Sequence, residues 1–295
     1  MKGFAVESIE PMTLSRHGRL ADMYVLSPFV WKSGKGFEIL IRAVPRRDDE
    51  PRLKMAEIWW GQSDDGLHFD MDRAPVIFPG PGLEDVDGCE DPTVIVDKGR
   101  VHMWYTGWNQ QQATGRLLYA AGPDAQRLAK QRLVLDSKPP YANPKEATVV
   151  PSGDGRWRLF FEYAEGEASK IGMATADSLE GPWTIDGPVI DRRKDSWDSW
   201  HLSTGPIIGA GSDQPVMFYN GATRDAHWRI GWAAFDKNYT KIVGRGDDPV
   251  IKPQEVTKGA TDIAFASSAI EAGDVIHLYY SISDQDIHRA TVRRR

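Results

Sequence analysis

The sequence has very little cysteine, no long apolar run and no excess of basic residues. Its single cysteine, Cys89, cannot form an internal disulfide, which fits a reducing compartment. No stretch approaches the roughly 18–20 apolar residues of a membrane-spanning helix, and residues 1–12 lack the apolar core of a secretory signal. The 36 basic residues are outnumbered by 42 acidic ones, giving a formal net charge of −6. We therefore expect a cytoplasmic protein that binds neither nucleic acid nor membrane.

Several motifs of common enzymes are also missing. The chain has no Gly-x-Ser-x-Gly elbow, no phosphate-binding loop, no Gly-x-Gly-x-x-Gly fingerprint and no His-Glu-x-x-His zinc signature. We therefore expect no metal and no cofactor. What the chain does have is ordinary globular composition, with 41% hydrophobic and 26% charged residues. It is also rich in aromatic residues (11 Trp, 9 Tyr and 10 Phe), which serve both in cores and in sugar-binding clefts.

The strongest signal is a repeat of about 60 residues. Five short segments rich in aromatic and β-branched residues end at positions 42, 106, 162, 220 and 281, so the steps between them are 64, 56, 58 and 61. Most follow a turn signal containing glycine. A second apolar segment precedes each one, and a third follows it and usually closes with an Asp-led turn. Each repeat therefore predicts at least three strands, and the linking loops can supply a fourth.

Five four-stranded repeats predict an all-β protein, a five-bladed β-propeller. Residues 125–133 are the best candidate for a helix, of one or two turns. No linker rich in Pro, Gly or Ser divides the chain, so we expect a single domain over residues 1–295. The alternative is a β-sandwich or two small β domains, which the regular spacing disfavours.

The inner strand of each blade lines the axis of a propeller, so polar residues at the start of these strands should converge. In Glu90-Asp91-Pro92, the proline biases Asp91 towards extended backbone at a strand entrance. Glu146 lies at the equivalent point of the next blade. Two carboxylates on neighbouring inner strands suit acid/base cleavage of a glycosidic bond. The full set is Asp22, Ser27, Glu90, Asp91, Lys145, Glu146, His201, Ser203, Asp262 and Ser267.

Glu162 is a further candidate, because it ends a predicted strand among aromatic residues. A buried acid is costly unless it is paired. Arg42 occupies the matching position in blade one. The two residues either form an ion pair with each other, or Glu162 has a catalytic role.

The ordered motifs resemble glycoside hydrolase family 130, the mannoside phosphorylases and β-mannosidases with five-bladed propellers. The resemblance implies that Asp91 is the general acid and that Lys145 contacts phosphate or substrate. It also implies that Arg42 and Asp284 occupy family site positions, and we expect Trp108, His201 and Asn220 at the substrate too. The segments that carry it are Gly88-Cys-Glu-Asp-Pro92, Lys145-Glu-Ala-Thr-Val-Val-Pro151, Ile230-Gly-Trp-Ala-Ala-Phe-Asp236 with Asp248-Pro-Val-Ile251, and Tyr279-Tyr-Ser-Ile-Ser-Asp284.

Three residues depart from the family pattern at places where a basic group is common: Thr93, Glu162 and Asn220. Phosphate recognition depends on Arg and Lys. We therefore predict a glycoside hydrolase that cleaves β-mannoside-type oligosaccharides, with Asp91 as acid and Glu146 or Glu162 as the base toward water.

Three alternatives remain open. The first is a phosphate-dependent mannoside phosphorylase. The second is a family 43-like arabinosidase or xylosidase, which the Leu179-Glu-Gly-Pro-Trp183 turn resembles and in which Glu146 would be the acid. The third is a non-catalytic sugar-binding propeller with Trp59, Trp60, Trp108 and Trp200 as stacking platforms.

Overall fold

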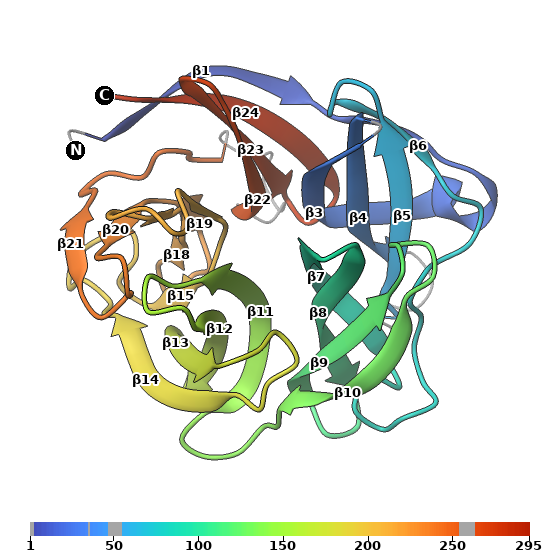
Figure 1. The fold of residues 1–295 in the computed structure, drawn as a ribbon, viewed down its shortest axis with the longest axis horizontal. Helices are drawn as coiled ribbons and strands as arrows, with labels where there is room; N and C mark the ends of the chain where they lie inside the picture. The colour runs from blue at the N-terminus through green and yellow to red at the C-terminus, as the bar shows by residue number, and fades with distance from the viewer. Residues whose placement is uncertain (1–2, 35, 47–54, 254–262) are drawn as a thin grey trace.

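The computed structural model describes residues 3–34, 36–46, 55–253 and 263–295, and Asp262 lies outside them. Within these ranges the chain is almost entirely β-structure, with one short 3-10 helix at Gly18–Asp22. The strands form five groups around a central axis (Figure 1). The predicted five-bladed β-propeller is confirmed. No helix in the described part of the chain is long and apolar enough to cross a lipid bilayer.

Four blades contain four antiparallel strands that run in order from the axis to the rim. Blade one has β3 (Met23–Ser33), β4 (Gly36–Pro45), β5 (Glu57–Ser63) and β6 (His68–Met71), with the short β2 (Thr13–Ser15) added in parallel outside β6. Blade two has β7 (Gly88–Asp97), β8 (Arg100–Asn109), β9 (Thr114–Gly122) and β10 (Ala129–Leu135). Blade three has β11 (Ala142–Pro151), β12 (Trp157–Glu165), β13 (Ala168–Ala176) and β14 (Thr184–Ile190).

Blade five closes the ring with a strand from the other end of the chain. It has β22 (Ala264–Ala272), β23 (Val275–Ile282), β24 (Asp286–Arg294) and, as its outer strand, β1 (Phe4–Pro11). β1 pairs antiparallel with β24, from Phe4 opposite Arg294 to Pro11 opposite His288. The two ends of the chain therefore lie together in one blade (Figure 1).

Blade four is split into two small sheets. Its inner strand is interrupted at Gly205-Pro206, because proline has no N–H for the ladder. The backbone there approaches Phe218 so closely that a Cβ on Gly205 would lie 2.0 Å from the Phe218 carbonyl oxygen. One sheet contains β15 (His201–Ser203), β18 (Asn220–Ala222) and β19 (Trp228–Ile230). The other contains β16 (Ile207–Ile208), β17 (Val216–Met217), β20 (Ala233–Phe235) and β21 (Ile242–Arg245).

The apolar core lies between blades. Each of five buried clusters joins side chains of two neighbouring blades, such as Trp59 of blade one with Tyr279 of blade five, and Trp104 of blade two with Phe161 of blade three. Burial of apolar surface, at roughly 25 cal/mol per Å², thus holds the blades to one another. Polar residues can then occupy the axis.

The predicted helix at residues 125–133 is wrong. Asp124 accepts a hydrogen bond from the Arg127 backbone N–H in a turn, and β10 begins at Ala129. β10 pairs along β9, so a neighbouring strand edge provides the hydrogen bonds that a helix would have formed internally.

Candidate active site

Two adjoining cavities of about 150 and 340 Å³ lie beside the inner strands of blades one to three. The smaller is also lined by Glu162, Trp228 and Phe265, and the larger by Glu90 and Tyr24. Five charged residues are shared by the linings of the two cavities: Arg42, Asp91, Lys145, Glu146 and Asp284.

One backbone conformation recurs on the three inner strands and directs one side chain of each strand towards the cavities. Ser27, Asp91 and Glu146 have left-handed backbone, with φ of 52°, 52° and 53°. Each lies at an irregularity where the register with the second strand shifts. A β-bulge of this kind redirects side chains, and left-handed backbone at a non-glycine residue costs on the order of 1 kcal/mol. Each of the three inner strands therefore contributes one residue with the same strained backbone conformation to the smaller cavity.

Asp91 and Glu146 form a proton-sharing pair, hydrogen-bonded to each other. The Ser27 hydroxyl donates to Asp91 Oδ1 at 2.6 Å, and Arg42 Nη1 donates to the same oxygen at 3.2 Å. Burial alone would raise the pKa of Asp91, but Arg42 and these hydrogen bonds outweigh it and lower the pKa. Burial and the nearby Asp91 charge raise the pKa of Glu146 well above its ordinary value. The shared proton therefore lies on Glu146.

Arg42 reaches the cavity from β4 and pairs with two acids of the Glu-Asp-Pro motif. Its Nη2 lies 2.7 Å from Glu90 Oε1 and its Nη1 lies 3.2 Å from Asp91 Oδ1. The predicted alternative of an ion pair between Arg42 and Glu162 is therefore wrong. Matching positions on two blades are separated by the rotation of the propeller, so they need not lie side by side.

Glu162 instead lies opposite Lys145 on the paired strands β12 and β11, and both line the smaller cavity. Burial would lower the pKa of Lys145, but the carboxylates around it, Glu162 foremost, outweigh this and raise the pKa. Lys145 is therefore a permanent cation enclosed by acids.

The charged groups lining the two cavities in the described ranges are mainly acidic. With the proton on Glu146, the carboxylates of Glu90, Asp91, Glu162 and Asp284 face only two cations, Arg42 and Lys145. Both cations already lie among these carboxylates. An anionic ligand would therefore meet net negative charge.

The lining of the smaller cavity also has an apolar part. It comprises Trp228 at the start of β19, together with Ile263 and Phe265. Sequence reasoning missed Trp228, because the third strand of a blade was not expected to reach the axis. No sequence motif marks this residue.

Comparison with known proteins agrees with this architecture. Residues 28–294 match the glycoside hydrolase family 130 model, described as β-1,4-mannooligosaccharide phosphorylase. The chain belongs to glycoside hydrolase family 130. A β-1,2-mannobiose phosphorylase of Thermoanaerobacter sp. (strain X514) is 24% identical over 283 residues, which cover 92% of this family-130 chain and 90% of that relative.

Two solved structures share the fold of this family-130 protein. One is a β-1,2-mannobiose phosphorylase from Listeria innocua in complex with β-1,2-mannobiose, with a TM-score of 0.78, 18% identity and coverage of 97% of this chain and 91% of that chain. The other has a TM-score of 0.75, 23% identity and coverage of 91% and 84%. Its description states that the family of mannoside phosphorylases contains glycoside hydrolases that target β-1,2-mannosidic linkages in Candida mannan.

Asp284 lines both cavities of the family-130 chain, as Asp91, Glu146, Lys145 and Arg42 do. His201 does not line them. Its ring stacks against Trp228 with centroids 5.7 Å apart, and burial lowers its pKa, which favours the neutral imidazole. The predicted direct contact of His201 with substrate is therefore not supported by its position.

Asn220 and Trp108 also lie away from the two cavities. Asn220 is fully buried and ties blade four to blade five, because its Nδ2 donates to Thr204 O at 2.9 Å and Ala266 O at 3.1 Å. The Trp108 indole N–H donates to Gln110 Oε1 at 3.1 Å. The structure therefore does not bring either residue together with the charged groups of the two cavities, and their contact with substrate stays a prediction.

Thr93 likewise has a structural contact, since its hydroxyl donates to Ala147 O at 2.5 Å and joins two inner strands. Of the three departures from the family pattern, only Glu162 lines either of the two cavities. Of the predicted platforms, Trp59 is buried in the core, and Trp60 donates to Glu38 at 2.9 Å. Trp200 donates to Glu167 O at 3.0 Å.

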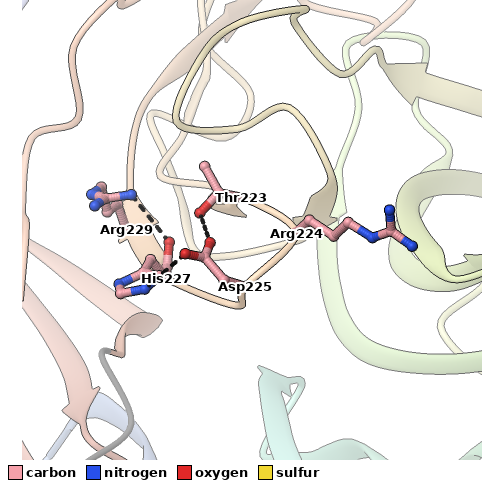
Figure 2. Close-up of a pocket in the computed structure, with 5 residues that line it drawn as sticks. All are labelled: Thr223, Arg224, Asp225, His227 and Arg229. Atoms are coloured by element: carbon pink, nitrogen blue, oxygen red, sulfur yellow. Dashed lines mark hydrogen bonds and ion pairs between the residues drawn. The ribbon is translucent and has the colours of Figure 1, made fainter. Parts of the chain in front are cut away.

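A separate open hollow of about 760 Å³ lies at the loop between β18 and β19 (Figure 2). Its polar groups are largely engaged with one another. The Thr223 hydroxyl donates to Asp225 at 2.5 Å, and His227 Nε2 lies 3.0 Å from Asp225 Oδ2. Arg224 points away from them towards blade three (Figure 2) and pairs with Glu167 at 2.7 Å. None of the predicted catalytic carboxylates lines this hollow.

Proposed function

We propose that this family-130 protein is a hydrolase that cleaves β-mannosidic bonds and transfers the mannosyl group to water. The observation that carries the proposal is the composition of the cavity: Glu146 with its raised pKa, a separate carboxylate at Glu162, and an excess of acidic over basic residues. A sugar hydroxyl or a water molecule is neutral and can bind among these groups, whereas inorganic phosphate would be repelled.

Glu146 is the proton donor in this proposal. Its raised pKa favours the protonated form, which can protonate the glycosidic oxygen as the bond from that oxygen to the anomeric carbon breaks. Asp91 stays ionised and stabilises the positive charge that develops on the sugar ring. This revises the role inferred from resemblance, where Asp91 was the acid, and agrees with the role that the family 43 alternative gave Glu146.

Glu162 is the base. Asp91 cannot serve, because it is hydrogen-bonded to Glu146, and such oxygens lie only about 3 Å apart. An inverting hydrolase needs its two carboxyl groups roughly 6.5–9.5 Å apart to accommodate the water. Glu162 comes from the second strand of blade three and lines the same cavity. It takes one proton from the water while the water oxygen bonds to the anomeric carbon.

A second candidate is phosphorolysis, which the names of the curated relatives favour. The β-1,2-mannobiose phosphorylase of Thermoanaerobacter sp. (strain X514) is 24% identical to this chain, and a 1,2-β-oligomannan phosphorylase of the same strain is 23% identical. In that case Lys145 and Arg42 would have to bind phosphate while keeping their carboxylate partners. The charge of the cavity is the reason we place hydrolysis first.

The test is product analysis. Purified protein is incubated with β-1,2-mannobiose and with β-1,4-mannobiose, each with and without inorganic phosphate, because the relatives and the family model name different linkages. We expect free mannose, released at the same rate without phosphate. Strict phosphate dependence with mannose 1-phosphate as product would establish the second candidate. Binding of mannobiose without any cleavage would indicate a non-catalytic sugar-binding propeller.

A further inference from the structure

The smaller cavity is lined by two chemically different sets of side chains. Charged residues, most of them from blades one to three, line it together with the apolar side chains of Trp228, Ile263 and Phe265 from blades four and five. Trp228 is the largest side chain of this apolar set. It does not belong to any motif identified in the sequence.

The Trp228 indole is held in place from several directions. The Phe265 ring meets it nearly edge-on, with centroids 5.1 Å apart and an interplanar angle of 64°. The His201 imidazole stacks against it at 5.7 Å and 26°. The Trp228 backbone also forms a parallel bridge with Ile263. A ring fixed in this way loses little further conformational freedom when a ligand binds.

A pyranose ring suits a cavity that is lined by both charged and apolar side chains. Its C–H groups form apolar patches that pack against aromatic surfaces, while its hydroxyl groups bond to carboxylates and cations. We infer that Trp228 is the sugar-binding platform that orients the mannosyl ring towards Glu146 and Glu162, and so determines specificity. This inference rests on the proposed function, and it deepens that function by naming the residue that holds the sugar.

His201 is a positioning residue in this arrangement. Its Nδ1 lies 3.4 Å from the Ser169 hydroxyl, and that hydroxyl donates to Leu202 O at 3.0 Å. The imidazole is thus fixed to blade three and supports the indole. His201 acts on substrate through Trp228, without lining the cavity itself.

The experiment measures kcat and KM for mannobiose, together with the Kd of mannobiose by calorimetry in the Glu162→Gln background. We expect Trp228→Ala to raise KM and Kd by about tenfold or more, and Trp228→Phe to stay within about threefold of wild type. His201→Ala should raise KM by a smaller factor, and His201→Phe should restore it because a flat ring again supports the indole.

Trp200→Ala is the matched control. Trp200 is another partly exposed tryptophan of the same region, where it is covered by Arg224, and it lines neither cavity. It should leave KM within about twofold. If Trp228→Ala does not fold by circular dichroism, Trp228→Leu replaces it and keeps apolar volume without a flat ring.

The outcomes separate this inference from the proposed function. Unchanged mannobiose binding in folded Trp228→Ala or Trp228→Leu overturns the role of Trp228 and leaves the proposed function standing. A wild-type protein that neither binds nor cleaves either mannobiose overturns the proposed function, and this inference with it.

Discussion

Replacing Glu162 with glutamine tests its role as the general base without removing the other charged groups of the site. The change keeps the size of the side chain but removes the carboxylate that accepts the proton from water, and loss of a general base typically lowers the rate by about 10²–10⁴-fold. Lys145 loses one neighbouring charge but keeps Glu90, Asp91 and Glu146 around it. We therefore expect the free energy of unfolding to change by less than about 1.5 kcal/mol.

The assay for Glu162→Gln follows mannobiose cleavage with and without added sodium azide. Azide is a small anionic nucleophile that needs no base, and Glu162→Gln removes one of the carboxylates that would repel it. It can therefore attack the anomeric carbon in place of water as Glu146 protonates the departing oxygen. We expect the rate to recover and α-mannosyl azide to form, because attack comes from the face where water would bind. The configuration of the product is read by nuclear magnetic resonance.

Glu165→Gln is the matched control. Glu165 ends the same strand, β12, but is exposed and pairs with Lys170 at 2.9 Å and Arg192 at 2.7 Å. Its replacement should leave cleavage within about twofold and give no response to azide. A Glu162→Gln enzyme with more than a third of wild-type activity would refute the assignment of the base, and so would a large loss that azide does not restore.

Three further predictions concern the pair, its cation and a buried amide. Arg42→Met leaves Glu90 and Asp91 without their nearest cation, so urea denaturation at pH 7 should show a loss of about 3–5 kcal/mol. The loss should be smaller at pH 3, because the stability from the lowered pKa of Asp91 disappears as pH falls below the ordinary value of 3.8. Glu146 has a raised pKa, so its contribution to stability is lost as pH rises. The melting temperature of Glu146→Gln should therefore fall less than that of wild type between pH 5 and pH 9, and equal falls would contradict the placement of the proton. Asn220→Ala should lower the free energy of unfolding in urea by about 2–3 kcal/mol, because it leaves buried backbone groups unpaired. KM for mannobiose should stay unchanged, and a raised KM would show that Asn220 belongs to the substrate site.

The blades and part of the site could be predicted from sequence because they depend on local patterns. The aromatic segments recur at nearly constant spacing, and each became the second strand of a blade. Glu90-Asp91-Pro92 and Lys145-Glu146 fall at the same point of their repeats, and the structure brings Asp91 and Glu146 into contact.

Other features depend on relations between blades that no local pattern records. The partner of Arg42 is set by the rotation from one blade to the next. The placement of the proton on Glu146 follows from burial and from the neighbouring charges of Asp91 and Glu162, which together outweigh Arg42. Trp228 lines the cavity from the third strand of blade four, and Asn220 is buried where it joins blade four to blade five.

The pairing of β1 with β24 has a consequence for synthesis of the protein. Phe4 and Arg294 are partners although 290 positions separate them, so the ring cannot close until the last strand has left the ribosome. Until then, blade five lacks two of its strands, and the buried cluster between blades four and five lacks Ala290 and Val292 of β24. The nascent chain must hold exposed strand edges throughout translation, and such edges are sites of aggregation. Removing residues 3–11 would make that temporary state permanent, leaving β24 as an open edge in a ring without its closing strand.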